Sequence, residues 1–175
     1  LAQGAALRDQ VGQLATSVPD MDGDGVAEVM VQVLGDEVLY LLYGSDDLRD
    51  GVDLAADADA WFTGAEDPIR AIAEVGDWTG DGKADLALSL GTPTTTGGGG
   101  VRLLPNQVWS GENDLEDAAE GSVVPDADNV AVGAGISLTA GDVDGNGTPD
   151  ILVADPGWDA GAGGEGAVYL FLLDL

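Results

Sequence analysis

Apolar residues alternate with polar or small ones in three short segments, a pattern of period two that predicts β-strands. These alternating segments are residues 14–18, 71–75 and 136–140. Each leads into an acidic, glycine-rich loop, and two apolar runs follow the loop. The first runs are residues 29–33, 86–90 and 151–154, and the second runs are residues 37–44, 100–105 and 166–173. Leu-rich or β-branched runs of this length are typical of buried strands, so the sequence predicts an all-β fold.

The three acidic loops align as copies of one repeat. They begin at Asp20, Asp77 and Asp142, so the spacings are 77 − 20 = 57 and 142 − 77 = 65 residues. A unit of about 60 residues fits an antiparallel, four-stranded blade of a β-propeller. We expect about three blades, at residues 1–64, 65–126 and 127–175.

Weaker fourth strands are expected in the first two blades, at residues 57–64 and 121–126. The third blade has no counterpart and is expected to lack its outer strand. Residues 1–4 resemble the tail of such a strand, placed before the first blade. The one helical piece expected is a turn or two within residues 111–121.

Oxygen-bearing residues recur at positions 1, 3, 5 and 9 of each loop, and the carbonyl of position 7 completes the set. Five or more oxygen ligands around a tight turn suit Ca²⁺, and glycines permit the bends that such a loop needs. The predicted ligands are Asp142, Asp144, Asn146, Thr148 and Asp150 in the third loop, Asp20, Asp22, Asp24, Val26 and Glu28 in the first, and Asp77, Thr79, Asp81, Lys83 and Asp85 in the second.

An EF-hand and a magnesium site fit the sequence less well than this kind of calcium loop. An EF-hand needs a bidentate Glu at position 12 and flanking helices, whereas position 12 here is Val31, Leu88 or Val153 and the flanks are strands. Magnesium demands octahedral geometry and retains water. Plain Asp-Gly turns would explain one such loop, but three copies in register favour metal binding.

The three loops should not bind equally. The third is closest to an ideal ligand set, and the first carries Glu28 where Asp is expected. The second lacks a carboxylate at position 3 and contains Lys83. We therefore expect up to three Ca²⁺ ions, with the site at residues 77–85 the weakest.

Composition excludes several functions. The chain of 175 residues has 33 acids against 5 bases, a net charge of −28, which disfavours binding to nucleic acid or to anionic lipid. No apolar run is long enough to insert into a membrane. Because the sequence has no Cys and no His, thiol nucleophiles, Cys/His zinc sites and His-based catalysis are absent. No carboxylate pair is singled out for catalysis, and the chain is not expected to be an enzyme.

The repeats resemble the FG-GAP repeat of integrin-α-type β-propellers. The third copy reads "AGISLTAGDVDGNGTPDILVADP" and then "GAVYLF". Ala134 replaces the Phe of that pattern, whereas Gly135 and Ser137 keep their places. The other two copies keep the acidic loop but have degenerate flanking strands.

This resemblance implies an extracellular or cell-surface propeller whose calcium loops rigidify one face, with adhesion or ligand binding as the usual role. Three copies do not close a ring, since propellers have at least four blades. The chain is expected either to be completed by further blades of a longer protein or to associate with itself through unpaired strand edges. A structural, filament-forming role and an adhesive or lectin-like role both stay open.

Two further features bear on that choice. The four Trp residues are expected to pack between strands, with Trp158 the best candidate for stacking on a sugar of a glycan or matrix protein. The Thr92–Thr96 run is either a plain loop or a site of O-linked glycans.

Overall fold

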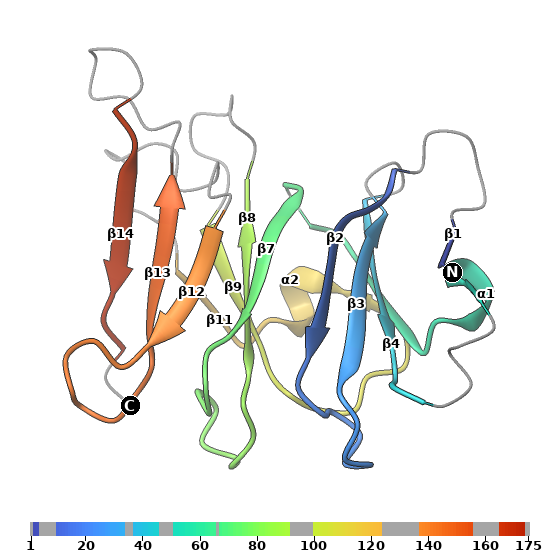
Figure 1. Ribbon diagram of the computed structural model, residues 1–175, viewed down its shortest axis with the longest axis horizontal. Coiled ribbons are helices and arrows are strands. Elements are labelled where there is room, and N and C mark those ends of the chain that lie inside the picture. The colour runs from blue at the N-terminus through green and yellow to red at the C-terminus, as the bar shows by residue number, and fades with distance from the viewer. Residues whose placement is uncertain are drawn as a thin grey trace. The chain divides into compact units, whose positions relative to one another are not determined.

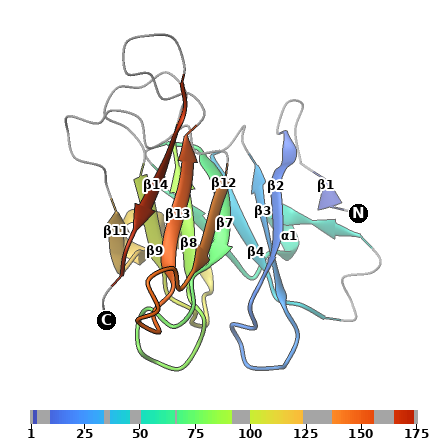
Figure 2. The ribbon, with the colours of Figure 1, turned by 60° about the vertical axis from the view of Figure 1, so that its left-hand side comes forward.

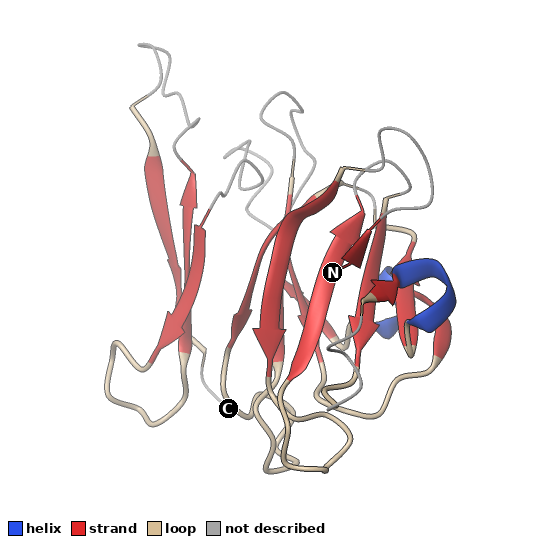
Figure 3. Ribbon diagram, turned by 45° about the vertical axis from the view of Figure 1, so that its right-hand side comes forward, coloured by secondary structure: helices blue, strands red, loops and turns tan. Residues whose placement is uncertain are grey.

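The computed structural model describes residues 2–3, 10–33, 37–45, 51–65, 67–91, 100–123, 137–155 and 165–173. Strands dominate this part of the chain, and the helices in it are single turns (Figure 3). The predicted all-β class is therefore confirmed. The chain divides into two compact units, which are Leu1–Ala65 with Asn106–Ala118, and Glu66–Pro105 with Ala119–Leu175.

The first unit contains a five-stranded sheet with the order β10-β6-β4-β3-β2. Four of its strands pair antiparallel, as a propeller blade requires: β2 (Val11–Val18), β3 (Glu28–Val33), β4 (Val38–Leu42) and β6 (Ala60–Thr63). Three of these strands, β2, β3 and β4, are labelled in Figure 1. The fifth, β10 (Gly111–Asp114), pairs in parallel with β6. A separate parallel pair joins β1 (Ala2–Gln3) to β5 (Val52–Asp53).

The second unit contains two antiparallel sheets (Figure 2). One has the order β11-β9-β8-β7 and is built from β7 (Ile69–Glu74), β8 (Leu86–Leu90), β9 (Gly100–Leu104) and β11 (Gly121–Val123). The other has the order β12-β13-β14 and is built from β12 (Ser137–Gly141), β13 (Asp150–Asp155) and β14 (Ala167–Phe171). Within the described residues, the third sheet has three strands.

Residues 111–121 contain the short helical turn that was predicted within them, together with a strand, β10, that was not predicted. They form β10, then the single turn α2 (Leu115–Ala118), and then the start of β11. The free edge of β6 offers the backbone of residues 111–114 a pairing partner, and the Gly111 N–H also donates to the Asp59 carbonyl at 2.9 Å. Long-range pairing therefore overrides the local helical pattern, and it places Asn106–Ala118 in the first unit.

A second helical turn, α1 (Leu54–Asp57), was not predicted. Its N-cap is Asp53, whose carboxylate accepts a hydrogen bond from the Ala55 N–H at 3.2 Å. The turn buries Leu54 against Val31, Val33 and Leu42 of the first sheet. Burial of this one leucine outweighs the weak helical preference of so short a segment.

The core of the second unit lies between its two sheets. Val75, Ala87, Val101 and Leu103 from the β7–β9 region form one cluster with Leu138, Ile151 and Val153 of β12 and β13. Trp78 packs against this cluster. In the first unit, Trp109 is 9% exposed and meets Phe62 edge-to-face at 5.3 Å between ring centroids. Packing is thus confirmed as the role of these two tryptophans.

Several residues singled out from the sequence lie outside the described part of the chain. They are Thr92–Thr96, Ala134, Gly135, Ile136 and Trp158.

Candidate metal centre

Each acidic loop joins the first two strands of a sheet: β2 to β3, β7 to β8, and β12 to β13. In the second unit the two loops lie at the same end of their sheets (Figures 1 and 2). In the third loop, Gly145 and Gly147 have φ angles of 80° and 92°. These left-handed conformations suit glycine and wind the loop back on itself.

The Asp at position 1 organises the backbone of its own loop. Asp142 accepts hydrogen bonds from the Gly145 and Gly147 N–H groups at 2.7 and 3.0 Å. Asp20 does the same with Gly23 and Gly25 at 2.6 and 2.8 Å. In the second loop Asp77 accepts from Asp81 and Gly82 at 2.9 and 2.8 Å. In all three loops the Asp at position 1 therefore accepts two loop N–H groups, one of them from position 6. The other donor is position 4 in the first and third loops and position 5 in the second.

The acid at position 9 opens, or directly precedes, the second strand of its sheet and is buried. Glu28, Asp85 and Asp150 are each 0% exposed. Each carboxylate accepts the N–H of the residue at position 2, which is Met21 at 2.9 Å, Trp78 at 2.8 Å and Val143 at 2.8 Å. This contact ties the start of the loop to its end.

The same acid also holds the third strand of its sheet in two of the copies. The second oxygen of Glu28 accepts the Gly44 N–H at 2.6 Å, and the second oxygen of Asp150 accepts the Leu173 N–H at 3.0 Å. Both donors lie two residues beyond the end of the third strand. The contact was not predicted, although Gly44 and Leu173 stand at equivalent places in the repeat. At Gly44 the fit is so close that a Cβ would overlap the Ala27 carbonyl oxygen.

These contacts determine the acidity of Asp150. The N–H groups of Leu173 and Val143 stabilise its ionised form and hold its pKa below the ordinary value, although burial opposes the shift. Asp150 is thus ionised within its loop at neutral pH, as a metal ligand must be.

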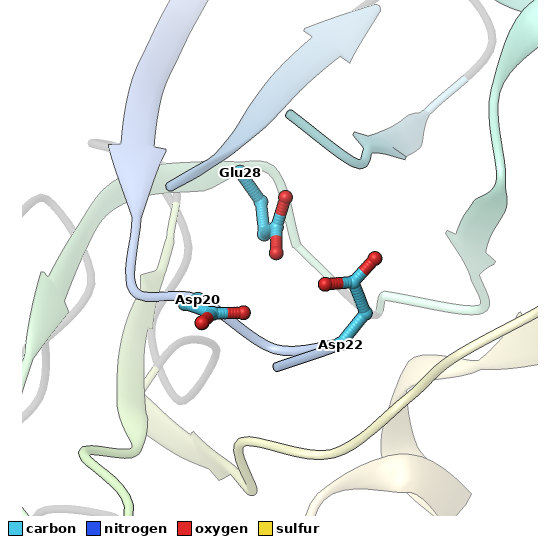
Figure 4. A group of neighbouring side chains, drawn as sticks. All are labelled: Asp20, Asp22 and Glu28. Atoms are coloured by element: carbon cyan, nitrogen blue, oxygen red, sulfur yellow. The ribbon is translucent and has the colours of Figure 1, made fainter. Parts of the chain in front are cut away.

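Three carboxylates converge in the first and third loops. In the first, oxygens of Asp20, Asp22 and Glu28 all lie within 4.8 Å of one another, and their side chains point toward a shared space (Figure 4). In the third, Asp142, Asp144 and Asp150 meet the same description. The extra methylene of Glu28 does not prevent the convergence. Each group consists of positions 1, 3 and 9, as the sequence predicted for the ligand set.

The second loop differs, because its carboxylates Asp77, Asp81 and Asp85 do not form such a group among the described residues. Position 3 is Thr79, whose Oγ1 is buried and has no hydrogen-bond partner in this part of the structure. Lys83 lies in the loop with an exposed side chain. The structure therefore distinguishes this loop from the other two.

Positions 5 and 7 have mainly local contacts. Asp24 accepts the Val26 N–H at 2.7 Å, Asp81 accepts the Lys83 N–H at 2.8 Å, and the Asn146 Oδ1 accepts the Thr148 N–H at 2.6 Å. Asn146 also donates from Nδ2 to the Leu173 carbonyl at 2.9 Å. The role of Val26, Lys83 and Thr148 as carbonyl ligands stays a prediction.

Comparison with known proteins identifies one of the copies. The family model described as the FG-GAP repeat matches residues 134–171, which include β12, the third loop, β13 and β14. A search of curated proteins gave no match. Within the described residues, none of the helices has the length and apolar character needed to cross a bilayer. Residues 134–171 are therefore similar to an FG-GAP repeat, and the all-β structure with several antiparallel sheets is consistent with blades of that kind.

Proposed function

We propose that the chain is a calcium-binding, propeller-type repeat module with a structural role in an extracellular or cell-surface assembly. The observation that carries this proposal is the convergence of three carboxylates at positions 1, 3 and 9 of the first and third loops. In each group one member is fully buried, Glu28 in the first loop and Asp150 in the third.

Electrostatics favours a cation at these two places. Two like charges about 4.8 Å apart repel by between about 1 and 3 kcal/mol, depending on the effective dielectric constant. Each group contains three such pairs, and hydrogen bonds from the backbone hold the carboxylates together. A divalent cation converts this repulsion into attraction and lowers a net charge of −28.

The donor set fits calcium better than magnesium or zinc. It is made of carboxylate oxygens with nearby amide and backbone carbonyl oxygens, which are the hard ligands that Ca²⁺ takes in numbers of six to eight. Asp20, Asp22, Asp24 and Glu28 would hold the ion in the first loop, and Asp142, Asp144, Asn146 and Asp150 in the third. When bound, the ion would crosslink the loop to the strand that follows it.

A structural role fits these features better than recognition of a sugar. Trp78 and Trp109 contribute to the cores of the two units rather than to an exposed stacking platform. The predicted metal would stabilise the strand connections. The extracellular location is supported by the FG-GAP resemblance and by high free calcium outside cells.

Thermal unfolding in calcium and in excess EDTA tests the proposal. Calcium that binds only the native state adds about 2.7 kcal/mol per site at 100 times its dissociation constant. For a chain of this size about 1 kcal/mol raises Tm by roughly 2–4 °C, so two sites should raise it by at least about 10 °C. Asp142→Asn should remove about half of this rise, whereas the control Asp117→Asn, an exposed acid of α2, should leave it unchanged. Equal Tm values with and without calcium would refute the proposal.

A further inference from the structure

The first acidic loop is in contact with a distant part of the chain, residues 106–114, which we call the strap. The strap follows β9 in the chain but belongs to the first compact unit, where its β10 pairs in parallel with β6. Asn106, at its start, is 2% exposed. The Asn106 Nδ2 donates to the backbone carbonyl of Asp20, 86 residues away in the chain, at 3.2 Å. The strap therefore contacts position 1 of the predicted ligand set.

A second contact of the strap lies at Trp109. The Tyr43 hydroxyl accepts the Trp109 N–H at 2.7 Å and donates to the Trp109 carbonyl at 2.8 Å. Partial burial raises the pKa of Tyr43, although the hydrogen bond with the Trp109 backbone opposes this shift. The charges of three carboxylates, Asp59, Glu28 and Asp22, raise the pKa further. The hydroxyl thus keeps its proton at neutral pH and can make both bonds.

Tyr43 also lies next to a residue that contacts the predicted metal site. The neighbouring Gly44 N–H donates to the second oxygen of Glu28, at position 9, at 2.6 Å. The Tyr43 N–H donates to the Asp59 carboxylate at 2.7 Å, and the Asp59 backbone carbonyl accepts the Gly111 N–H of the strap at 2.9 Å. The strap is therefore joined, through Tyr43 and Asp59, to the segment that contacts Glu28.

These contacts form a closed ring that includes the first loop. Asn106 joins the strap to Asp20 at position 1, and Tyr43 with its neighbour joins the strap to Glu28 at position 9. Figure 4 shows that Asp20 and Glu28 point toward a space that they share with Asp22. Without a cation, repulsion among the three carboxylates acts on both ends of the ring, and a divalent cation reverses it. Ion binding and docking of the strap therefore stabilise the same arrangement of positions 1 and 9.

We propose that calcium in the first loop stabilises the docked strap, and that Asn106 and Tyr43 are positioning residues for this site. The proposal rests on the proposed function, since it requires the first loop to bind calcium. The coupling is reciprocal, because a docked strap raises the calcium affinity by the same factor by which calcium favours docking. The chain enters the strap from the second unit and returns to that unit after Ala118, so the ion would anchor a crossing of the chain between the units.

The third loop provides an internal comparison. Its buried Asp150 accepts the Leu173 N–H at 3.0 Å, and Asn146 donates to the Leu173 carbonyl at 2.9 Å. These contacts lie within the second unit, whereas the strap belongs to the first. An ion in the third loop should therefore stabilise the end of its own repeat and leave the strap unaffected.

Hydrogen–deuterium exchange of the strap, measured by mass spectrometry in calcium and in EDTA, tests the proposal. Trp109 and Gly111 donate their N–H groups to Tyr43 and Asp59, so their exchange reports docking. Calcium should slow exchange in the strap at least about fivefold. Asp22→Asn, at position 3 of the first loop, should abolish this slowing. Asp144→Asn, the matched change in the third loop, should preserve it.

Calcium affinity gives a second readout, which general stabilisation of the folded chain does not change. In the Asp144→Asn background, Asn106→Ala and Tyr43→Phe should each weaken calcium binding to the first loop about fivefold, as expected for the loss of one or two hydrogen bonds. Gln107→Ala is the matched control, because Gln107 is an exposed amide one residue further along the strap. It should change neither affinity nor exchange. The Tm of each variant in EDTA shows whether the fold is kept.

The outcomes separate this proposal from the proposed function. Calcium that binds the first loop without slowing exchange in the strap would overturn the proposal alone. Slowing that persists in Asp22→Asn, or parental calcium affinity in both Asn106→Ala and Tyr43→Phe, would also overturn it. Equilibrium dialysis that detects no bound calcium would overturn both.

Discussion

The second and third acidic loops share one scaffold but differ in the chemistry that it supports. In both, an Asp at position 1 accepts two loop N–H groups and a fully buried Asp at position 9 accepts the N–H of position 2. Only the third brings three carboxylates within 4.8 Å among the described residues. The difference lies at position 3, which is Thr79 in one loop and Asp144 in the other.

The comparison separates two roles that the sequence motif combines. The carboxylates at positions 1 and 9 stabilise the loop by accepting backbone hydrogen bonds, and the copy expected to be the weakest metal site keeps both of them. The carboxylate at position 3 accepts one loop N–H, that of position 5, and it is the group that completes the convergence of charge. Acidic residues in such a repeat can therefore be retained for folding alone.

The largest effect should come from removing the shared scaffold. Asp85→Ala and Asp150→Ala each leave two part-buried backbone donors without their acceptor, which costs at most about 1–3 kcal/mol per donor. Both variants should therefore lose at most about 2–6 kcal/mol of unfolding free energy in EDTA, as measured by urea denaturation. Asp117→Ala should change it by less than about 0.5 kcal/mol. If Asp85→Ala were as stable as the parent, the scaffold role of position 9 would be wrong.

The next effect should be specific to metal binding. Asp144→Ala removes a converging carboxylate from the third loop, and we expect the calcium affinity of that loop to fall at least tenfold, or about 1.4 kcal/mol. Stability in EDTA should stay nearly constant, or rise slightly as repulsion is relieved. Thr79→Ala serves as the matched change in the second loop and should leave the tight sites unaffected. Calorimetric titration distinguishes these results.

The reverse change sharpens the comparison. Thr79→Asp supplies the second loop with the carboxylate that its copies have at position 3. The buried Oγ1 of Thr79 already lies at this place without a hydrogen-bond partner in the described structure. We expect the variant to bind one more calcium ion per chain than the parent does under the same conditions. An unchanged stoichiometry would show that position 3 does not decide between the two loops.

The smallest predicted effect concerns pH. The backbone donors at Leu173 and Val143 lower the pKa of Asp150 in the folded state. The stabilisation is therefore present above the ordinary Asp pKa and is lost as pH falls through the lowered value. In EDTA, Asp150→Asn should flatten the acid limb of the stability curve below the ordinary Asp pKa. An acid limb identical to that of the parent would contradict this account of Asp150.

Much of the fold was predictable because period-two patterning and repetition are local signals. The six strands that flank the acidic loops and the three strands that follow them were predicted, as were the fourth strands near residues 57–64 and 121–126. The parallel addition of β10 to β6 was missed, because pairing between residues about 50 positions apart leaves no mark in local periodicity. The turn α1 was missed because four residues are too few for a helical period to show.

The sequence predicted the candidate site to a similar extent. Spacing alone named positions 1, 3 and 9, which are the residues that converge in the first and third loops. It did not reveal that Glu28 and Asp150 also hold Gly44 and Leu173 beyond the third strand. That contact depends on where two strands end in space. The sequence also gave no sign that Val168 and Leu170 are exposed, because β14 is as apolar as β4 and β9, in which the equivalent residues are buried.

Counting bound ions tests the central claim most directly. Equilibrium dialysis of the chelator-treated protein against calcium should give two tight sites per chain, with one lost in Asp142→Asn and the other in Asp22→Asn. A third, weaker site at the second loop would agree with the expected order of the copies. No binding, or binding that survives both substitutions together, would contradict the claim that the converging carboxylates of the first and third loops hold calcium.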